Sequence, residues 1–124
     1  MSDGQKSLYE RLGGYDAITA VTNDLLPRLQ GDPQLGRFWA HRGADGVARE
    51  KQLLIDFLCA SAGGPVYYRG RGMELCHRGM RITESDWNIL LGHAGATLAK
   101  FKVPDAEQRE VVAFLQSLKK EIVE

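Results

Sequence analysis

Three histidines and two cysteines are the side chains of this sequence best suited to hold a metal ion. His77 differs from the others in its position, because it lies in a short segment, 73–79, that follows a glycine-rich stretch over 63–70. Long apolar segments with helical spacing precede and follow it. The imidazole of histidine is the commonest metal ligand in proteins, and a single histidine in this setting is typical of the one protein ligand to a haem iron. We therefore expect His77 to be an iron ligand.

The elements that must position His77 are helical. Apolar side chains recur at spacings of three and four over 16–29, 47–61, 83–101 and 105–122, which predicts four substantial helices in two antiparallel pairs. A brief helix over 7–12 and a short helical turn after Asp32 complete the prediction. Thr83 with Asp86, and Asp105 with Gln108, have the spacing of a capping box. Pro27 predicts a kink or an early end of the first long helix.

The connector over 63–81 interrupts this pattern. It contains five glycines and one proline, and it leaves room for about two turns of helix at 73–78. Glycine after the second long helix can adopt the left-handed conformation that ends a helix. A connector of this length inside a compact domain is usually functional.

Length and charge limit the possible functions. The chain has 124 residues, enough for a single domain over 1–124. Sixteen basic and sixteen acidic residues cancel, so we expect no nucleic-acid or membrane partner and favour a small molecule. No apolar run reaches the roughly 18 residues of a membrane span, and the first residues lack a signal-peptide pattern, so a cytoplasmic location is expected. Cys59 and Cys76 are predicted to be buried thiols.

Four segments, 8–14, 32–39, 57–65 and 73–77, together resemble the truncated haemoglobins, most nearly the first group. Their order and spacing cover nearly the whole chain. The resemblance implies an all-α truncated globin, a two-over-two helical sandwich with a short proximal helix in a long loop. It also implies haem b as the cofactor, with His77 on the iron, and reversible binding of oxygen, carbon monoxide or nitric oxide.

The resemblance also places the side chains expected around haem, although each of them is equally an ordinary core residue. They are Phe38, Trp39, Leu54, Phe57, Leu58, Tyr68, Met73, Ile82, Trp87 and Leu90. Tyr68 matches a position near the propionates, where its hydroxyl could donate a hydrogen bond. Lys51, Arg69, Arg71 and Arg78 are candidates for pairing with the propionates, although exposed basic side chains are usually just solvated.

The distal side departs from the family pattern. Leu26 stands where the family has a tyrosine, and Glu50 and Leu54 stand where it has glutamines. Each lost donor removes roughly 1.5–3 kcal/mol from the binding of oxygen. A shift of one helical turn would bring Asn23 or Gln30 to the place of Leu26, but we prefer the direct alignment.

Several alternatives follow for the distal side. Glu50, a candidate catalytic residue, either turns to solvent or stays protonated as a donor or as an acid–base group for peroxide. His41 could occupy the sixth iron position, although an exposed loop is its simpler place. The alternative functions are a haem-dependent peroxidase, a nitric oxide dioxygenase-type enzyme supplied by an unknown reductase, or a gas or redox sensor. We expect a monomer or a weak dimer.

Overall fold

The computed structural model describes residues 6–66, 68, 70 and 72–124, apart from the side chains of residues 75 and 76. Its elements, in chain order, are α1 Leu8–Leu12, α2 Gly14–Gln30, η1 Leu35–Trp39, α3 Ala44–Ser61, α4 Met73–His77, α5 Glu84–Lys100, α6 Asp105–Ser117 and α7 Lys119–Ile122. All the elements in this part of the chain are helices. None of them is long and apolar enough to cross a membrane.

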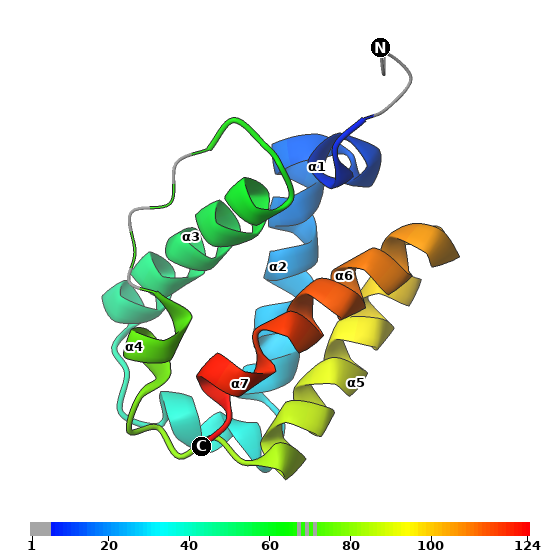
Figure 1. The fold of residues 1–124 in the computed structure, drawn as a ribbon. Coiled ribbons are helices and arrows are strands. Elements are labelled where there is room, and N and C mark those ends of the chain that lie inside the picture. The colour runs from blue at the N-terminus through cyan, green and yellow to red at the C-terminus, as the bar shows by residue number, and fades with distance from the viewer. Residues whose placement is uncertain (1–5, 67, 69, 71) are drawn as a thin grey trace.

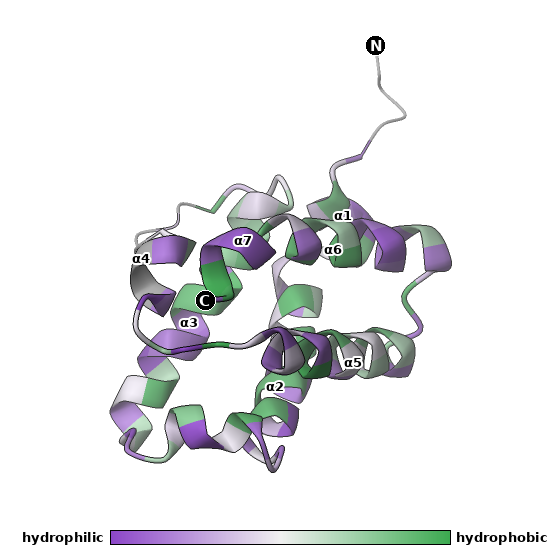
Figure 2. Ribbon diagram, turned by 60° about the horizontal axis from the view of Figure 1, so that its bottom comes forward, coloured by the Kyte–Doolittle hydropathy of each residue, from purple (hydrophilic) through white to green (hydrophobic). Residues whose placement is uncertain are grey.

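The four long helices form a two-over-two sandwich. Helices α5 and α6 run antiparallel (Figure 1), and α2 packs against both α3 and α5. Hydrophobic and hydrophilic residues alternate along the ribbons of the long helices (Figure 2), as expected when one face of each helix is apolar. The all-α prediction is therefore confirmed, and the short helix α4 lies in the long connector as expected.

Local signals set several helix ends. Thr83 caps α5: its Oγ1 accepts from the Asp86 N–H at 3.1 Å, and the Asp86 carboxylate accepts from the Thr83 N–H at 2.9 Å. This is the predicted capping box. Gly13 ends α1 with a φ of 110°, and Gly63 lies just beyond α3 with a φ of 93°. Both values belong to the left-handed region, which glycine adopts without a steric penalty.

Helix α2 continues through Pro27 to Gln30, so the helix does not end early at this proline, and the alternative of a kink stays a prediction. Two other predicted boundaries are wrong. Asp105 does not cap α6: Pro104 precedes the helix, and the Gln108 side chain instead donates to the Val103 carbonyl at 2.7 Å. The last helix is also broken at Leu118 into α6 and α7.

The closed core is small. Among the described residues, nine apolar side chains are buried, and one cluster of them joins Ile18 of α2 to Ile55 and Cys59 of α3. The Cys59 thiol is free, and burial raises its pKa; the side chain of Cys76 lies outside the described part. A Cβ on Gly64 would lie 2.4 Å from the ring of Tyr9, so this glycine allows α1 to pack over the end of α3.

Polar contacts hold the helices at fixed positions around the interior. Asp24 of α2 accepts from Lys100 at 2.8 Å and from Thr97 at 2.9 Å, both on α5. Hydrogen bonds from Lys100 and Arg28 keep the pKa of Asp24 well below its ordinary value. His93 of α5 bonds Asp32 at 2.8 Å, which ties the turn after α2 to the same helix.

Candidate functional site

His77 is the last residue of α4 and is half-buried. Its Nδ1 lies 2.8 Å from the Met73 carbonyl oxygen, one turn earlier. A carbonyl only accepts, so Nδ1 carries the proton, and the lone pair of the neutral imidazole is then on Nε2. A second hydrogen bond that fixes the tautomer and ring orientation is typical of metal-binding histidines. The geometry suits coordination through Nε2.

The backbone around α4 explains why this helix is so short. Gly72 precedes it in an extended conformation and offers no side-chain cap. Arg78 returns to extended backbone, and Gly79 follows with a φ of 85°. The five helical residues suffice to bring the Met73 carbonyl within hydrogen-bonding distance of the His77 ring. The sequence anticipated the helix, but its exact end at His77 comes from this turn.

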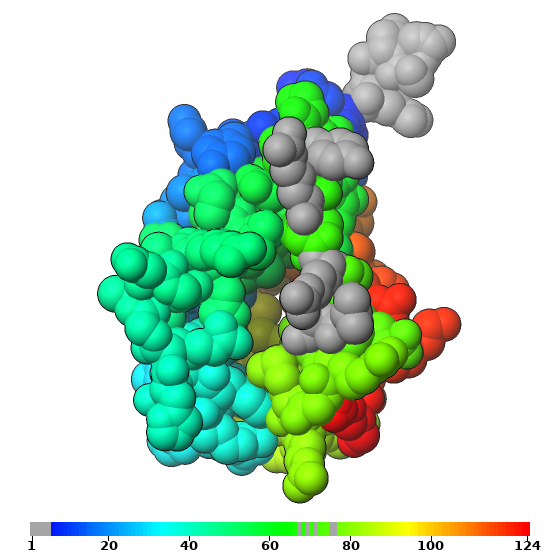
Figure 3. Space-filling view, turned by 90° about the vertical axis from the view of Figure 1, so that its left-hand side faces the viewer, coloured from blue at the N-terminus to red at the C-terminus, as the bar shows by residue number. Residues whose placement is uncertain are grey.

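A hollow opens beside α4. Figure 3 shows it between the η1 and α3 side of the molecule and the α4 side, with α5 visible at its floor. It lies on the face where the connector between α3 and α5 crosses the molecule (Figure 1). Within the described part of this connector the one helix is α4, with five residues.

Nine of the ten predicted cofactor contacts are half-buried side chains on the elements around this hollow or on the connector. They are Phe38 and Trp39 of η1, Leu54, Phe57 and Leu58 of α3, Tyr68 and Ile82 of the connector, Met73 of α4, and Leu90 of α5. Among the described large apolar side chains, only Tyr15 and Phe101 are classed as exposed. These nine side chains therefore have apolar surface that is neither buried in the core nor fully exposed to solvent. A flat apolar group such as haem fits this property.

Trp87, the tenth predicted contact, differs from the other nine in its burial. It is only 1 % exposed, and its Nε1 donates to the Gln116 side chain at 3.0 Å. Trp87 therefore takes part in the packing between α5 and α6, and its contact with the cofactor stays a prediction.

Aromatic rings gather on one side of the interior. Phe57 lies edge-on to Tyr68, with ring centroids 5.2 Å apart, and 5.9 Å from Phe114 of α6. The sequence identified α6 only as an amphipathic helix and missed Phe114 as a neighbour of the candidate contacts. The signal available in the sequence was the apolar stripe of this amphipathic helix. In the structure no residue of α6 is buried.

The three predicted distal residues lie on two helices that pack together. Leu26 is on α2, and Glu50 and Leu54 are on α3. Both leucines are half-buried. The Glu50 side chain is 43 % exposed and forms an ion pair with Arg42, from the loop before α3. Glu50, the only charged residue among these three, is thus held by Arg42, which is exposed.

The remaining polar candidates lie elsewhere. His41 is exposed, and His93 is bonded to Asp32. The Tyr15 hydroxyl accepts a hydrogen bond from the Gln52 amide at 2.9 Å between exposed residues. None of these side chains is among the three predicted distal residues.

The candidate propionate partners differ in how they are placed. The hydroxyl of Tyr68 lies beside Gly70: a Cβ added to Gly70 would be 2.2 Å from the hydroxyl oxygen. Lys51 is half-buried, whereas Arg78 is exposed and 4.0 Å from Glu74. Arg69 and Arg71 lie outside the described residues.

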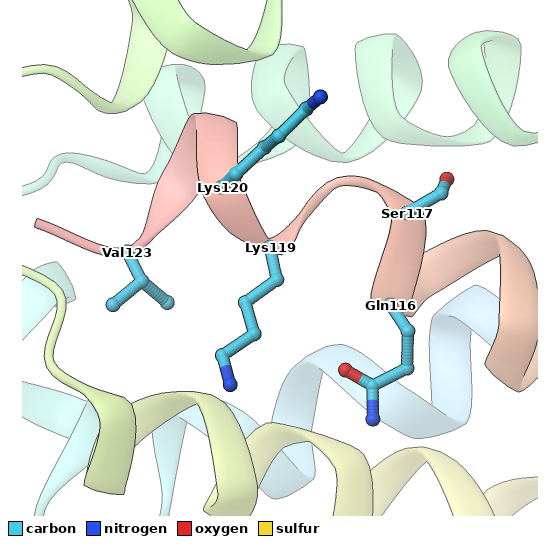
Figure 4. A pocket seen from close by; sticks show the side chains of 5 residues that line it. All are labelled: Gln116, Ser117, Lys119, Lys120 and Val123. Atoms are coloured by element: carbon cyan, nitrogen blue, oxygen red, sulfur yellow. The ribbon is translucent and has the colours of Figure 1, made fainter.

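A second depression lies on the outer surface of α6 and α7. Figure 4 shows that it is lined by Gln116, Ser117, Lys119, Lys120 and Val123. Lys119 is paired with Glu84, and Gln116 accepts from Trp87. Both side chains are therefore engaged in contacts that hold α6 and α7 on α5, and the lining contains no histidine, cysteine, aspartate or glutamate.

Comparison with known proteins shows a consistent pattern. The family model of the bacterial-like globins matches residues 7–124. The group 1 truncated hemoglobin GlbN of Mycolicibacterium paratuberculosis is 30% identical over 94% of this chain and 83% of its own. The group 1 truncated hemoglobin of Tetrahymena pyriformis is 25% identical over 95% of each chain.

Solved structures agree with these sequence matches. The truncated hemoglobin of Tetrahymena pyriformis in its Fe(III) form superposes with a TM-score of 0.86 at 25% identity, covering 95% of this chain and 98% of that one. The 2/2 hemoglobin of Synechococcus sp. PCC 7002, in the cyanomet state and with covalently attached heme, gives 0.82 at 25% identity over 92% and 94%.

Proposed function

Because the chain belongs to the truncated (2/2) globins of the first group, which are haem proteins, we propose that it reversibly binds oxygen, carbon monoxide or nitric oxide at an iron held by His77. The observation that carries this proposal is the 2.8 Å contact between His77 Nδ1 and the Met73 carbonyl. It fixes the tautomer in which Nε2 can donate to a metal. Haem b is the form of cofactor we propose.

The half-buried apolar side chains would hold haem and exclude water. Phe38 and Trp39 approach from η1, Leu54 and Phe57 from α3, and Met73 from α4. When bound, haem supplies an iron whose sixth position accepts a diatomic ligand. Tyr68, in the connector, would donate a hydrogen bond from its hydroxyl to a propionate. These side chains bind and orient the cofactor, and none of them needs to transfer a proton.

The distal side is proposed to be apolar. Leu26 and Leu54 have no hydrogen to donate to a ligand, and the ion pair with Arg42 keeps Glu50 turned outward. Oxygen, which accumulates negative charge when it binds, gains most from a nearby donor. We therefore expect fast oxygen release and comparatively tight binding of carbon monoxide and nitric oxide.

The ion pair between Glu50 and Arg42 also distinguishes the proposed ligand binding from the alternative function, a haem-dependent peroxidase. A peroxidase needs an acid–base group at the distal face, and Glu50 is the candidate that the sequence offers. Its carboxylate is bound to Arg42 at an exposed position, which favours ligand binding over peroxide chemistry. A nitric oxide dioxygenase would require a reductase. A separate reductase, a cytoplasmic location and a monomer or weak dimer stay predictions from the sequence.

An absorbance spectrum tests the proposal directly. Purified protein reconstituted with hemin should show a Soret band, and after dithionite and carbon monoxide it should give the spectrum of a histidine-ligated ferrous complex. His77→Ala should lose this spectrum and most of its haem affinity, because the protein ligand to iron is removed. The matched control is His41→Ala, which removes an exposed histidine and should change nothing.

Two results would contradict the proposal. One is a wild-type protein that takes up no hemin. The other is a His77→Ala variant with the wild-type carbon monoxide spectrum and haem affinity, which would show that another residue holds the iron.

A further inference from the structure

The short helix α4 does not hold its own position. It has five residues, lacks a side-chain N-cap and ends in extended backbone at Arg78. An isolated helix of this length is unstable in water, so contacts outside α4 must fix where His77 points. Helix α7 provides them, because it packs against α4.

The contacts converge on one side chain. The Glu124 carboxylate accepts from the backbone N–H of Gly79, at 2.8 Å to Oε2 and 3.2 Å to Oε1, and from the N–H of Arg81 at 3.1 Å. The Glu124 N–H donates to the Ile82 carbonyl at 2.8 Å. Glu124 therefore binds the segment 79–82 through both its side chain and its backbone N–H.

The backbone of this segment is shaped for an anion. Gly79 and Arg81 both have positive φ values, 85° and 57°, and their N–H groups point at the same carboxylate. Alternating backbone of this kind forms a concave anion-binding site. The left-handed conformation is unfavourable for arginine, and hydrogen bonds to a charged acceptor can hold it in place.

The segment is also tied to His77 itself. The Met80 N–H donates to the His77 carbonyl at 3.1 Å, so a movement of residues 79–81 is transmitted to the end of α4. Ile122 of α7 is buried, which anchors the helix that ends two residues before Glu124.

We propose that Glu124 is a positioning residue for the proximal histidine. By holding Gly79 and Arg81 it sets the direction of the His77 ring, and with it the strength of the bond to iron and the retention of haem. This inference rests on the proposed function, because it requires His77 to be the iron ligand.

Two readouts test it. In hemin-reconstituted ferrous protein, Glu124→Ala should shift or broaden the iron–histidine stretching band in resonance Raman spectra and speed haem loss by on the order of tenfold. In haem-free protein, the amides of Gly79 and Arg81 should exchange faster by a similar factor. Glu124→Gln keeps one carbonyl acceptor and should give intermediate values.

Matched controls separate positioning from general destabilisation. Glu121→Ala removes an exposed carboxylate from α7, the helix that ends two residues before Glu124. Glu110→Ala removes one of the two ion pairs that Arg11 of α1 forms with α6, far from α4 in the sequence, and should lower stability without moving the band. Circular dichroism confirms that each variant folds.

An unchanged band and haem-loss rate in Glu124→Ala, or changes no larger than in Glu110→Ala, would overturn the inference. A wild-type protein without an iron–histidine band would instead overturn the proposed function, and the two failures are told apart by the wild-type spectrum alone.

Discussion

At the scale of single residues, the proposed differences from a first-group globin concern the distal side. The direct alignment puts Leu26 and Leu54 where the resemblance implies hydrogen-bond donors, and Glu50 pairs with Arg42. The proposed proximal ligand, His77, has its Nδ1 2.8 Å from the Met73 carbonyl oxygen. The residue-level expectation is a protein that retains haem but holds oxygen weakly.

Restoring a donor should slow oxygen release. Leu26→Tyr places a hydroxyl on α2, and a hydrogen bond to the ligand should lower the dissociation rate by about 10- to 100-fold. Stopped-flow displacement of oxygen by carbon monoxide measures this rate. Leu26→Phe is the control, because it adds the ring without the hydroxyl. Equal slowing in both variants would mean that the ring only blocks the exit of the ligand.

At the scale of elements, buried polar contacts connect the helices that frame the interior. Asp86 is 1 % exposed and accepts from Arg37 at 2.6 Å and from Gln34 at 2.6 Å, both in the segment of η1. It also completes the cap of α5 with Thr83. The guanidinium of Arg37 holds the pKa of Asp86 well below its ordinary 3.8.

The stability of this contact should depend on pH in one direction. A carboxyl whose pKa is lowered by folding stabilises the protein above its unfolded pKa, and the contribution is lost as pH falls through the folded pKa. Asp86→Asn should therefore lower the free energy of unfolding by about 2 kcal/mol near pH 7. The difference from wild type should narrow below about pH 4.

Urea unfolding of the two haem-free proteins at several pH values measures the difference. Asp45→Asn, at an exposed position early in α3, is the control and should show little change. A difference for Asp86→Asn that stays constant down to pH 3 would show that the charge of Asp86 is not what stabilises the fold.

At the scale of the whole molecule, the interior is incompletely filled by the chain. The fully buried core among the described residues is small, and the apolar side chains around the hollow are half-buried. A ligand that binds only the folded state stabilises it by about 2.7 kcal/mol at a concentration 100-fold above its Kd. Haem should therefore contribute a large part of the stability.

Adding hemin to haem-free protein should raise the Tm by roughly 10 °C and reduce the fluorescence of a dye that binds exposed apolar surface. Differential scanning calorimetry measures the first effect. His77→Ala should show a much smaller rise, since it retains the apolar contacts without the iron bond. A Tm that does not respond to hemin would contradict the view that haem completes the core.

The sequence alone predicted the features that depend on neighbouring residues. Helical periodicity, the capping box of Thr83 and Asp86, and the glycines after α1 and α3 are local signals, so the four long helices and the short segment around His77 followed from them. The resemblance to truncated globins drew on the same segments. The boundaries that it missed are the start of α6 after Pro104 and the break at Leu118.

Only the tertiary structure decided which side chains face one another. It buries Trp87 behind Gln116, brings Phe114 to Phe57, and turns Glu50 toward Arg42. It also breaks the last helix, so that Glu124 reaches the segment after His77. These contacts join residues whose positions depend on helix packing, and neither periodicity nor residue type encodes them.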